Sequence, residues 1–235
     1  MTEIIIKMLL LMVASYLIGS IPTAVIISKK IFGFDIRTKG SGNMGSTNAM
    51  RVLGAKWGVI VQLIDILKGA IPVLIFADIV GAYWGMLTPE SFLSSPILEI
   101  IIGCSAVCGH IWSCFVGFKG GKGVNTALGM LLVVMPVEVG IAFACFAITI
   151  MITGFVSLSS LVGALTIPIT LIVRYNLFGV TITSYFTLIY FAIGIAVVVT
   201  YAHRSNIVRL AKGNENRFEK IRLLKFNCNC CKTKI

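Results

Sequence analysis

Long apolar stretches separated by short polar segments dominate the pattern along this chain. Stretches of about twenty residues or more lie near 4–28, 58–80, 97–116, 124–173 and 177–202. An α-helix needs about 20 apolar residues to cross a hydrocarbon core of roughly 30 Å. The pattern therefore predicts an all-α, polytopic membrane helical bundle with no separate soluble domain.

Composition supports this class, and the placement of charge predicts a topology. The chain is 57% apolar and 12% charged, with a mean hydropathy of +0.98, whereas soluble chains average about 25% charged residues. Its net charge of +11 is concentrated in residues 29–57, around Lys119 and Lys122, and in nine Lys and Arg residues after His203. Short loops rich in Lys and Arg stay in the cytoplasm, so all three segments are expected there.

This charge pattern also predicts the number of helices. The first stretch must enter from outside and the next two leave and return, so residues 124–202 begin and end inside and cross an even number of times. Four crossings use about 19 residues each, close to the length that a span requires. Turns between them are expected at Pro136, at Gly154 and at 174–179.

The prediction is a single membrane domain of seven transmembrane helices over 1–202, with the N-terminus outside and the C-terminus cytoplasmic. It carries glycine-rich cytoplasmic loops near 29–57 and 117–123, and a basic cytoplasmic segment follows over 203–235. Arg174 is the exception, because this topology places it outside. An uncleaved first span is favoured over a signal peptide, since no convincing small-residue cleavage site follows it.

The cysteines do not indicate a disulfide framework, because there are seven and several lie within predicted spans. Cys228, Cys230 and Cys231 in the tail suggest metal or lipid attachment, but no histidine or second cysteine pair lies nearby. Reduced, incidental thiols are the favoured interpretation. No metal and no cofactor are expected.

The loop GSGNMGSTNAMR, residues 40–51, contains the spacing of the dinucleotide fingerprint G-x-G-x-x-G. That function requires a βαβ unit, which a loop after a transmembrane helix does not provide. Glycines still allow close backbone approach, successive N–H groups can bind an anion, and a guanidinium suits phosphate. Ligand binding is favoured over a flexible connection. The candidates are Ser41, Gly42, Asn43, Thr47, Asn48 and Arg51.

A second glycine-rich loop, FKGGKGVNT at 118–126, lacks the spacing of a Walker P-loop. Two lysines on glycine hinges remain, just before a helix expected to begin near Val124, and a helix N-terminus favours anions. Lysines in this loop would also be expected if they only anchored it at the cytoplasmic face of the membrane. That role does not explain the four glycines of residues 117–123, so phosphate binding is favoured. The candidates are Lys119, Gly120, Gly121 and Lys122.

Charged and titratable residues also lie within or at the ends of the spans. Asp65 and Lys68 lie inside the second apolar stretch, on one helix face, where a charge costs about 2.5–3.5 kcal/mol on insertion scales. Two roles for these residues are equally favoured by the sequence: a structural salt bridge that supports the site, and a direct contact with substrate. His110 and His203 end predicted spans on the cytoplasmic side, and a site role is favoured over interfacial packing.

Two polar residues follow His203. Asn206 lies three residues after it, on the same face of a helix. Glu215 either orients a base or lysine, or is a solvated charge.

These motifs resemble the signatures of the bacterial acyl-phosphate:glycerol-3-phosphate acyltransferase (PlsY-type) family, over most of the chain. They are GSIP at 19–22, the loop at 40–51, DILKG at 65–69, GHIWSCFVGFKGGKG at 109–123 and HRSNIVRLAKGNE at 203–215. Ser46 stands where the family usually has alanine. The resemblance implies seven helices with the N-terminus outside, in agreement with the charge pattern.

The resemblance also implies an activity. Family members transfer a fatty acyl group from acyl phosphate to the 1-hydroxyl of sn-glycerol 3-phosphate, giving lysophosphatidic acid and phosphate in the first step of bacterial phospholipid synthesis. The site is then expected at the cytoplasmic face of the bacterial plasma membrane, where a polar pocket joins an apolar slot between helices.

By this resemblance the catalytic group that binds and orients the phosphates is Ser41, Arg51, Lys119, His203 and Asn206. Substrate binding is assigned to Gly42, Asn43, Thr47, Asn48, Lys68, His110, Gly120, Gly121, Lys122 and Glu215. The general base is His203, His110 or a substrate phosphate. Direct transfer is favoured over an acylated Ser41, since no base is visibly paired with that serine.

A transporter or channel for an anionic solute is the alternative of a different class, because Lys68 and the basic loops suit it. The chain has no inverted repeat and no matched pair of broken helices, which disfavours it. A non-catalytic scaffold that binds anionic lipids through the tail is weaker, since it leaves the glycine loops unexplained. The expected partners are the two substrates and the lipid bilayer. No nucleic acid is expected, and the sequence does not say whether the chain has protein partners.

Overall fold

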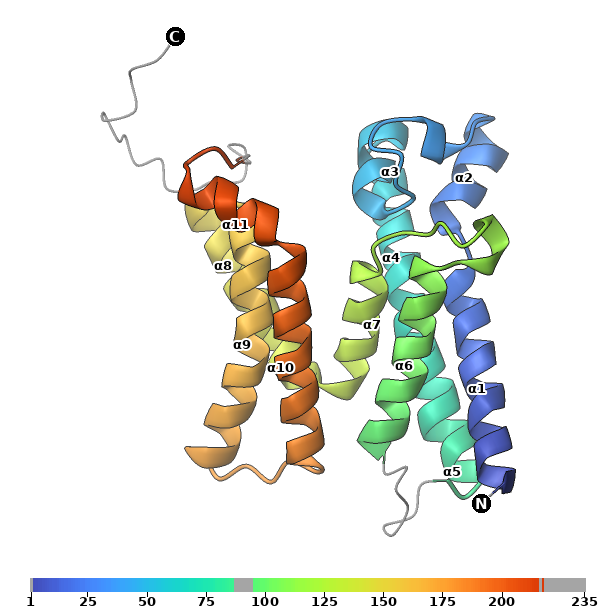
Figure 1. Ribbon diagram of the computed structural model, residues 1–235, viewed down its shortest axis with the longest axis vertical. Coiled ribbons are helices and arrows are strands. Elements are labelled where there is room, and N and C mark those ends of the chain that lie inside the picture. Colours follow the sequence, from blue (N-terminus) through green and yellow to red (C-terminus); the bar gives the residue numbers. More distant parts are fainter. Residues whose placement is uncertain (1, 87–94, 216, 218–235) are drawn as a thin grey trace. The chain divides into compact units, whose positions relative to one another are not determined.

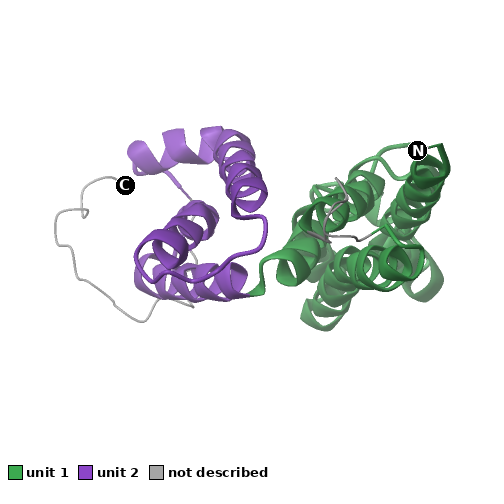
Figure 2. Ribbon diagram, turned by 90° about the horizontal axis from the view of Figure 1, so that it is seen from below, with its two compact units in different colours: residues 1–136 green, residues 137–235 purple. Residues whose placement is uncertain are grey.

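The computed structural model describes residues 2–86, 95–215 and 217, and the regular structure in that part of the chain is helical (Figure 1). The chain folds as two compact units, residues 1–136 and 137–235 (Figure 2). The all-α prediction is confirmed, whereas the single domain over 1–202 stays a prediction. Cys228, Cys230 and Cys231 lie outside the described residues, as does most of the basic tail after Glu215.

In the first unit three long helices, α1, α4 and α6, and the shorter α7 lie side by side (Figure 1). In chain order its elements are α1 (Thr2–Ser20), α2 (Thr23–Phe32), the 3₁₀ turn η1 (Ile36–Thr38), α3 (Ser46–Leu53), α4 (Ala55–Pro72), the π-helical η2 (Val73–Val80), α5 (Gly81–Tyr83), α6 (Ser95–Ile111), the 3₁₀ turn η3 (Cys114–Val116) and α7 (Val124–Val134). Helix α2 continues α1 after a break at Ile21 and Pro22, where proline removes a backbone donor. This break lies at the end of the unit that carries the glycine-rich loops.

The second unit consists of α8 (Pro136–Thr153), α9 (Val156–Asn176), α10 (Tyr185–Ala202) and the short α11 (Arg204–Ala211). Arg174, near the end of α9, forms an ion pair with Glu138 in the first turn of α8. Glu138 is buried, so the arginine that runs against the charge pattern has a charged partner within its own unit.

Six helical segments in the described residues are long and apolar enough to cross a membrane. They are Thr2–Phe32, Ala55–Tyr83, Pro96–Val116, Pro136–Thr153, Val156–Asn176 and Tyr185–Ala202. Helix α7 is apolar but has only 11 residues, about 17 Å of helix against a hydrocarbon core of roughly 30 Å. Seven crossings and the orientation of the termini therefore stay predictions.

The turns predicted within 124–202 agree with the observed helix ends. Helix α7 ends at Val134, before Pro136, and α8 ends at Thr153, before Gly154. Helix α9 ends at Asn176, inside the break expected at 174–179. Proline and glycine interrupt a helix through local backbone chemistry, which is why the sequence located these ends well.

Glycine brings the helices of the first unit into backbone contact. A Cβ atom placed on Gly69 of α4 would lie 2.0 Å from a carbonyl oxygen of α7, and one on Gly129 of α7 would lie 1.9 Å from a carbonyl oxygen of α4. Gly19 of α1 and Gly109 of α6 have the same reciprocal relation. Within a membrane, lipid tails are as apolar as leucine, so close packing of small residues is a main source of helix association.

Replacing either glycine of the α4–α7 contact by alanine is expected to lower the thermal unfolding midpoint of the detergent-solubilised protein. The added methyl group meets backbone, which cannot rotate away, and overpacking costs about 1–3 kcal/mol. Gly194→Ala in α10 is the matched control, because nothing lies within 4 Å of the added carbon and alanine favours the helix. Equal midpoints for Gly129→Ala and the control would contradict the packing argument.

Candidate functional site

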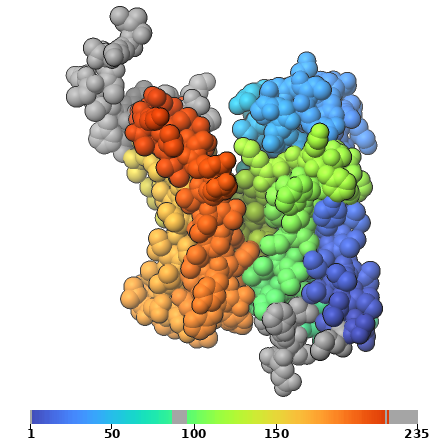
Figure 3. Space-filling view, viewed as in Figure 1, coloured from blue at the N-terminus to red at the C-terminus, as the bar shows by residue number. Residues whose placement is uncertain are grey.

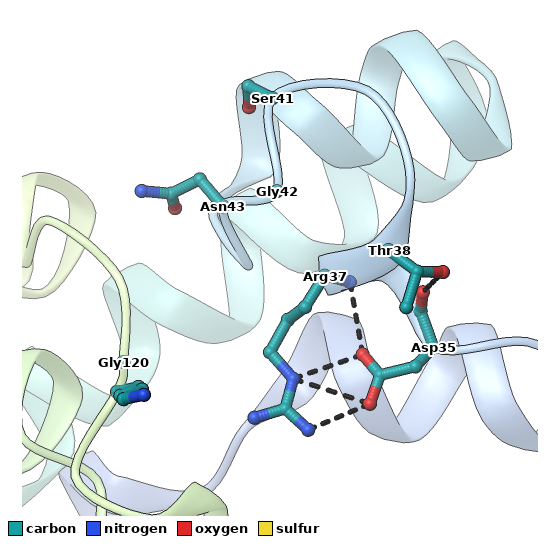
Figure 4. Close-up of a pocket in the computed structure, with 8 residues that line it drawn as sticks. Asp35, Arg37, Thr38, Ser41, Gly42, Asn43 and Gly120 are labelled. Carbon is teal, nitrogen blue, oxygen red and sulfur yellow. Dashed lines mark hydrogen bonds and ion pairs between the residues drawn. The ribbon is translucent and has the colours of Figure 1, made fainter.

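Two glycine-rich segments meet at one end of the first unit and enclose a cavity of about 460 Å³. We call residues 40–45 the first loop and residues 117–123 the second loop; both lie at the surface of this end (Figure 3). The cavity is lined by Asp35, Arg37, Thr38, Ser41, Gly42, Asn43, Lys119 and Gly120 (Figure 4). The structure thus brings together five predicted site residues: Ser41, Gly42, Asn43, Lys119 and Gly120.

Asn48, in the first turn of α3, organises the first loop. Its side chain is 2% exposed. Its Oδ1 accepts the Ser41 N–H at 2.9 Å, and its Nδ2 donates to the carbonyls of Lys39 at 3.1 Å and Asn43 at 2.8 Å. The Asn43 carboxamide oxygen in turn accepts the Gly45 N–H at 2.8 Å, just before α3 begins. Asn48 therefore holds the loop in shape and presents Ser41 and Asn43 to the cavity.

The second loop folds back over the last turn of α6. The N–H groups of Gly120 and Gly121 donate to the carbonyls of Ile111 and His110, both at 3.0 Å, which the end of a helix leaves without intrahelical partners. A Cβ atom on Gly121 would lie 2.1 Å from His110 Nε2, and one on Gly120 would lie 2.0 Å from the His110 carbonyl oxygen. The glycines are thus required by packing against α6.

This geometry corrects one expectation about the glycine amides. The sequence suggested that successive N–H groups of the first loop form an anion-binding nest, and that Gly120 and Gly121 of the second loop bind substrate. The amides of Gly120 and Gly121 are committed to α6, and the Gly42 N–H donates to the Lys39 carbonyl at 3.1 Å. The hydrogen bonds of these three amides lie within the protein and shape the loops, so these amides are not free donors of an anion-binding nest.

Three cationic side chains near the loops have no hydrogen-bonding or ionic partner among the described residues. Arg51, Lys119 and Lys122 are exposed, and none makes a hydrogen bond or ion pair with another described residue. Ser41 and Thr47 are exposed as well. Lys119 and Ser41 line the cavity, whereas Arg51, Thr47 and Lys122 lie outside its lining. An uncommitted lysine in a cavity lined by polar residues suits an anionic ligand.

Arg37 and Asp35 line the cavity too, and the sequence analysis did not single them out. Arg37 forms a fork onto the Asp35 carboxylate, with Nη2 to Oδ2 at 2.8 Å (Figure 4), and its Nη1 donates to the Val116 carbonyl at 3.3 Å. Hydrogen bonds from the Arg37 side chain hold the pKa of Asp35 well below its usual range. The Asp35 carboxylate in turn raises the pKa of Arg37. Arg37 therefore tethers the segment before the first loop to the segment before the second.

A local signal for this pair was present in the sequence. The Asp35 carboxylate accepts the N–H of the residue two positions later at 3.0 Å, which is the turn that aspartate commonly forms. Arg37 resembled the other basic residues of a cytoplasmic loop, so its commitment to a carboxylate was missed.

Lys68 and His110 lie outside the cavity lining, in a buried polar cluster. Lys68 Nζ lies 2.9 Å from Asp65 Oδ1 and donates to the Ile21 carbonyl at 3.0 Å, where the first span breaks. Thr23 donates to Asp65 at 3.2 Å, and His110 Nδ1 lies 3.9 Å from the same carboxylate oxygen. The Lys68 side chain is 4% exposed and its ammonium is engaged within the protein. The structure therefore favours a structural ion pair between Asp65 and Lys68 over a direct contact of Lys68 with substrate.

In the second unit, His203 lies at the junction of α10 and α11. Its Nδ1 is 2.8 Å from the Val199 carbonyl oxygen. A carbonyl can only accept, so Nδ1 carries a proton in this arrangement. When the imidazole is neutral, its Nε2 therefore holds a lone pair that is available to a substrate.

Glu215 fixes Asn206 in the same unit. One carboxylate oxygen accepts from Asn206 Nδ2 at 2.8 Å and from the Ser157 hydroxyl at 2.9 Å, and the other accepts from Arg209 Nε at 2.6 Å. Hydrogen bonds from Asn206 and then Arg209 lower the pKa of Glu215. Among the described residues, Glu215 therefore orients an amide and an arginine in place of the base or lysine that the sequence suggested, and its side chain, 7% exposed, is not a solvated charge.

Known proteins resemble this chain over nearly all of its length. Residues 9–213 match the family model described as glycerol-3-phosphate acyltransferase. Curated proteins of that name from Chlorobaculum parvum and Chlorobium chlorochromatii are 41% and 38% identical, covering 89% of this chain and 95% and 96% of their own lengths.

Solved structures agree. The crystal structure of PlsY (YgiH), an integral membrane glycerol 3-phosphate acyltransferase, in its glycerol 3-phosphate form, matches with a TM-score of 0.69 at 36% identity, covering 91% of this chain and 96% of that one. A lysophosphatidic acid form matches with the same TM-score at 35% identity, covering 92% and 97%.

Glu215→Gln is expected to lower the thermal unfolding midpoint at neutral pH, with a difference that shrinks on acidification. A carboxylate whose folded pKa is depressed stabilises the fold above its unfolded pKa of about 4.3, and this contribution is lost as pH falls through the folded pKa. Unfolding of both proteins from pH 7 down to about pH 3 measures it. Asn176→Ala serves as control, since it removes an exposed side-chain hydrogen bond to the Ile172 carbonyl and no titratable group. A difference that stays constant with pH would rule out the depressed pKa.

Proposed function

The chain belongs to the PlsY-type glycerol-3-phosphate acyltransferase family, and on that basis we propose that it uses acyl phosphate as its donor. The fatty acyl group goes to the 1-hydroxyl of sn-glycerol 3-phosphate, and the products are lysophosphatidic acid and inorganic phosphate. The forms in which the PlsY structures were solved, with glycerol 3-phosphate and with lysophosphatidic acid, support the acceptor and the product.

The observation that carries the proposal is the cavity with uncommitted cations beside it. Lys119 lines the cavity and Arg51 lies on α3, just beyond the first loop, and neither has a partner among the described residues. Like charges held together without counter-ions repel each other, so a bound phosphate stabilises the arrangement. At the membrane surface such a site keeps phosphate out of hydrocarbon while an acyl chain lies along apolar helices.

The chemistry requires positioning more than covalent catalysis. Acyl phosphate is an activated mixed anhydride: the hydroxyl oxygen attacks its carbonyl carbon, the carbon–oxygen bond to phosphate breaks, and phosphate leaves with the electron pair. Holding two reactants in line contributes roughly 7–11 kcal/mol in favourable cases. In this proposal Ser41, Arg51 and Lys119 bind and orient substrate phosphates, and positive groups stabilise the oxyanion and the leaving phosphate.

The other candidates complete the site in two ways. Asn43, Thr47 and Lys122 act as further ligands, Lys122 on the leaving phosphate, and the assignment of Asn206 to phosphate binding rests on its sequence motif. The shaping residues hydrogen-bond to other groups of the protein, and they are Gly42, Asn48, Gly120, Gly121 and Glu215. Lys68 and His110 support the end of the helices from which the loops leave.

His203 is the favoured general base. The hydrogen bond from its Nδ1 to Val199 leaves Nε2 to accept the hydroxyl proton. His110 is 3% exposed, and its Nε2 lies against Gly121, so the second candidate is a substrate phosphate. We retain direct transfer, because no hydrogen bond pairs the Ser41 hydroxyl with a base among the described residues.

We further propose that the site faces the cytoplasm in the bacterial plasma membrane, with seven crossings and the N-terminus outside. The lysines and arginines of residues 29–57 and the two lysines of the second loop support this orientation, because short basic loops prefer the cytoplasm. Helix α7 provides the seventh crossing in this topology.

Turnover with two donors tests the proposed donor. The purified protein receives labelled glycerol 3-phosphate with palmitoyl phosphate or, separately, palmitoyl-CoA. We expect lysophosphatidic acid only from palmitoyl phosphate, because the site is built around phosphate groups. Equal product from the thioester would refute the donor assignment. No product from either would favour an anion transporter, which uptake of glycerol 3-phosphate into proteoliposomes would then reveal.

His203→Ala is expected to lower kcat about 10²- to 10⁴-fold, the usual contribution of a general base. Arg204→Ala is the matched control, because Arg204 is exposed and stacks on Tyr201 beside it; its turnover should stay near wild type. Steady-state kinetics on both proteins decide the question. Activity of His203→Ala within a few-fold of wild type would transfer the base role to a substrate phosphate.

A further inference from the structure

Two short polar side chains join the starting points of α3 and α7. Asn125, the second residue of α7, donates from its Nδ2 to the Ser46 hydroxyl at 2.9 Å, and Ser46 is the first residue of α3. The two residues are 79 positions apart in the chain. Ser46 is only 9% exposed, so water competes weakly for this hydrogen bond.

Each partner lies directly after one of the two loops. The first loop ends at Gly45, the residue before Ser46, and the second loop ends at Gly123, two residues before Asn125. Ser41 and Asn43 approach the cavity from the first loop, and Lys119 and Gly120 from the second (Figure 4). The separation of the two helix starts therefore sets the separation of the two sides of the cavity.

Both helices are already packed on α4, away from the loops. Helix α7 contacts α4 through Gly69 and Gly129, and α3 contacts it where a Cβ on Gly58 would lie 2.0 Å from the Met50 side chain. These contacts place the helices, but they do not connect the helix starts to each other. The bond between Ser46 and Asn125 makes that connection.

Electrostatics works against this closeness in the absence of substrate. Each helix start carries a partial positive charge of about half a unit. Arg51, Lys119 and Lys122, which pair with no other described residue, add positive charge to the same helices and the second loop. A neutral hydrogen bond adds no further charge at the helix starts. It therefore opposes the repulsion without competing with an anionic ligand for the cations.

We propose that Ser46 and Asn125 form a positioning clamp that holds the two loops at the spacing needed to bind the phosphate of a substrate. Neither residue lines the cavity, so both act through the loops and are positioning residues. The inference rests on the proposed function, because it assumes that the cavity binds substrate phosphate. It adds to that function two residues that fix the geometry of the site.

Ser46→Ala, Asn125→Ala and the double variant test the clamp. Each single variant is expected to raise the KM and the calorimetric Kd for glycerol 3-phosphate roughly three- to tenfold, the range that corresponds to losing a neutral hydrogen bond, with little change in kcat. The double variant should match the weaker-binding single variant, because both substitutions remove the same interaction. Ser160→Ala is the control, since the Ser160 hydroxyl bonds only to the carbonyl one turn back in its own helix.

Unchanged Kd and KM in both single variants, or effects that simply add in the double variant, would overturn the clamp, even if the unfolding midpoint falls. Ser46→Ala removes a single oxygen atom, so it keeps the test valid if Asn125→Ala does not fold. Calorimetric binding of glycerol 3-phosphate by the wild-type protein distinguishes failure of the clamp from failure of the proposed function. If it binds glycerol 3-phosphate but palmitoyl phosphate is not its donor, the proposed function fails and the clamp is judged on Kd. If it binds no glycerol 3-phosphate, both fail.

Discussion

A buried ion pair between Asp65 and Lys68 links the parts of the first unit on which the site depends. Lys68 reaches the Ile21 carbonyl, where proline breaks the first span, and His110 at the end of α6 lies beside the same carboxylate. Removing one partner of such a pair typically costs about 3–5 kcal/mol, because the other charge is left buried alone. Both glycine loops leave the helices at this end, so their placement depends on a pair that itself lies outside the cavity lining.

The polar groups of the two loops and of α3 are of two kinds: some form hydrogen bonds that shape the site, and others are available to bind a ligand. Asn48 and the amides of Gly120 and Gly121 are committed within the protein, whereas Lys119 and Arg51 have no partner in the part of the chain that the structure describes. A site for anionic substrates at a membrane surface needs this division. Loops without internal bonds would lose conformational entropy on binding, and cations paired with carboxylates would have to break those pairs.

The sequence predicted the features that depend on local chemistry. Helix ends near Pro136 and Gly154, the all-helical class and the two loops follow from residues close together in the chain. It did not predict which amides of the second loop would be used, because the fold-back onto α6 is a tertiary contact. It also missed the bond from Asn125 to Ser46, since nothing in either segment alone indicates the other. The sequence predicted four helices of about 19 residues each within 124–202, whereas α7 has 11 residues.

The central claim is acyl transfer at the carbonyl carbon of acyl phosphate, and the fate of two labels tests it most directly. Palmitoyl phosphate labelled with ¹⁴C in the acyl chain and ³²P in the phosphate is turned over with unlabelled glycerol 3-phosphate by the purified protein. The account predicts ¹⁴C in lysophosphatidic acid and all released ³²P in inorganic phosphate, in equal amounts. Transfer of ³²P to the glycerol-containing product would mean phosphoryl transfer and would contradict the account.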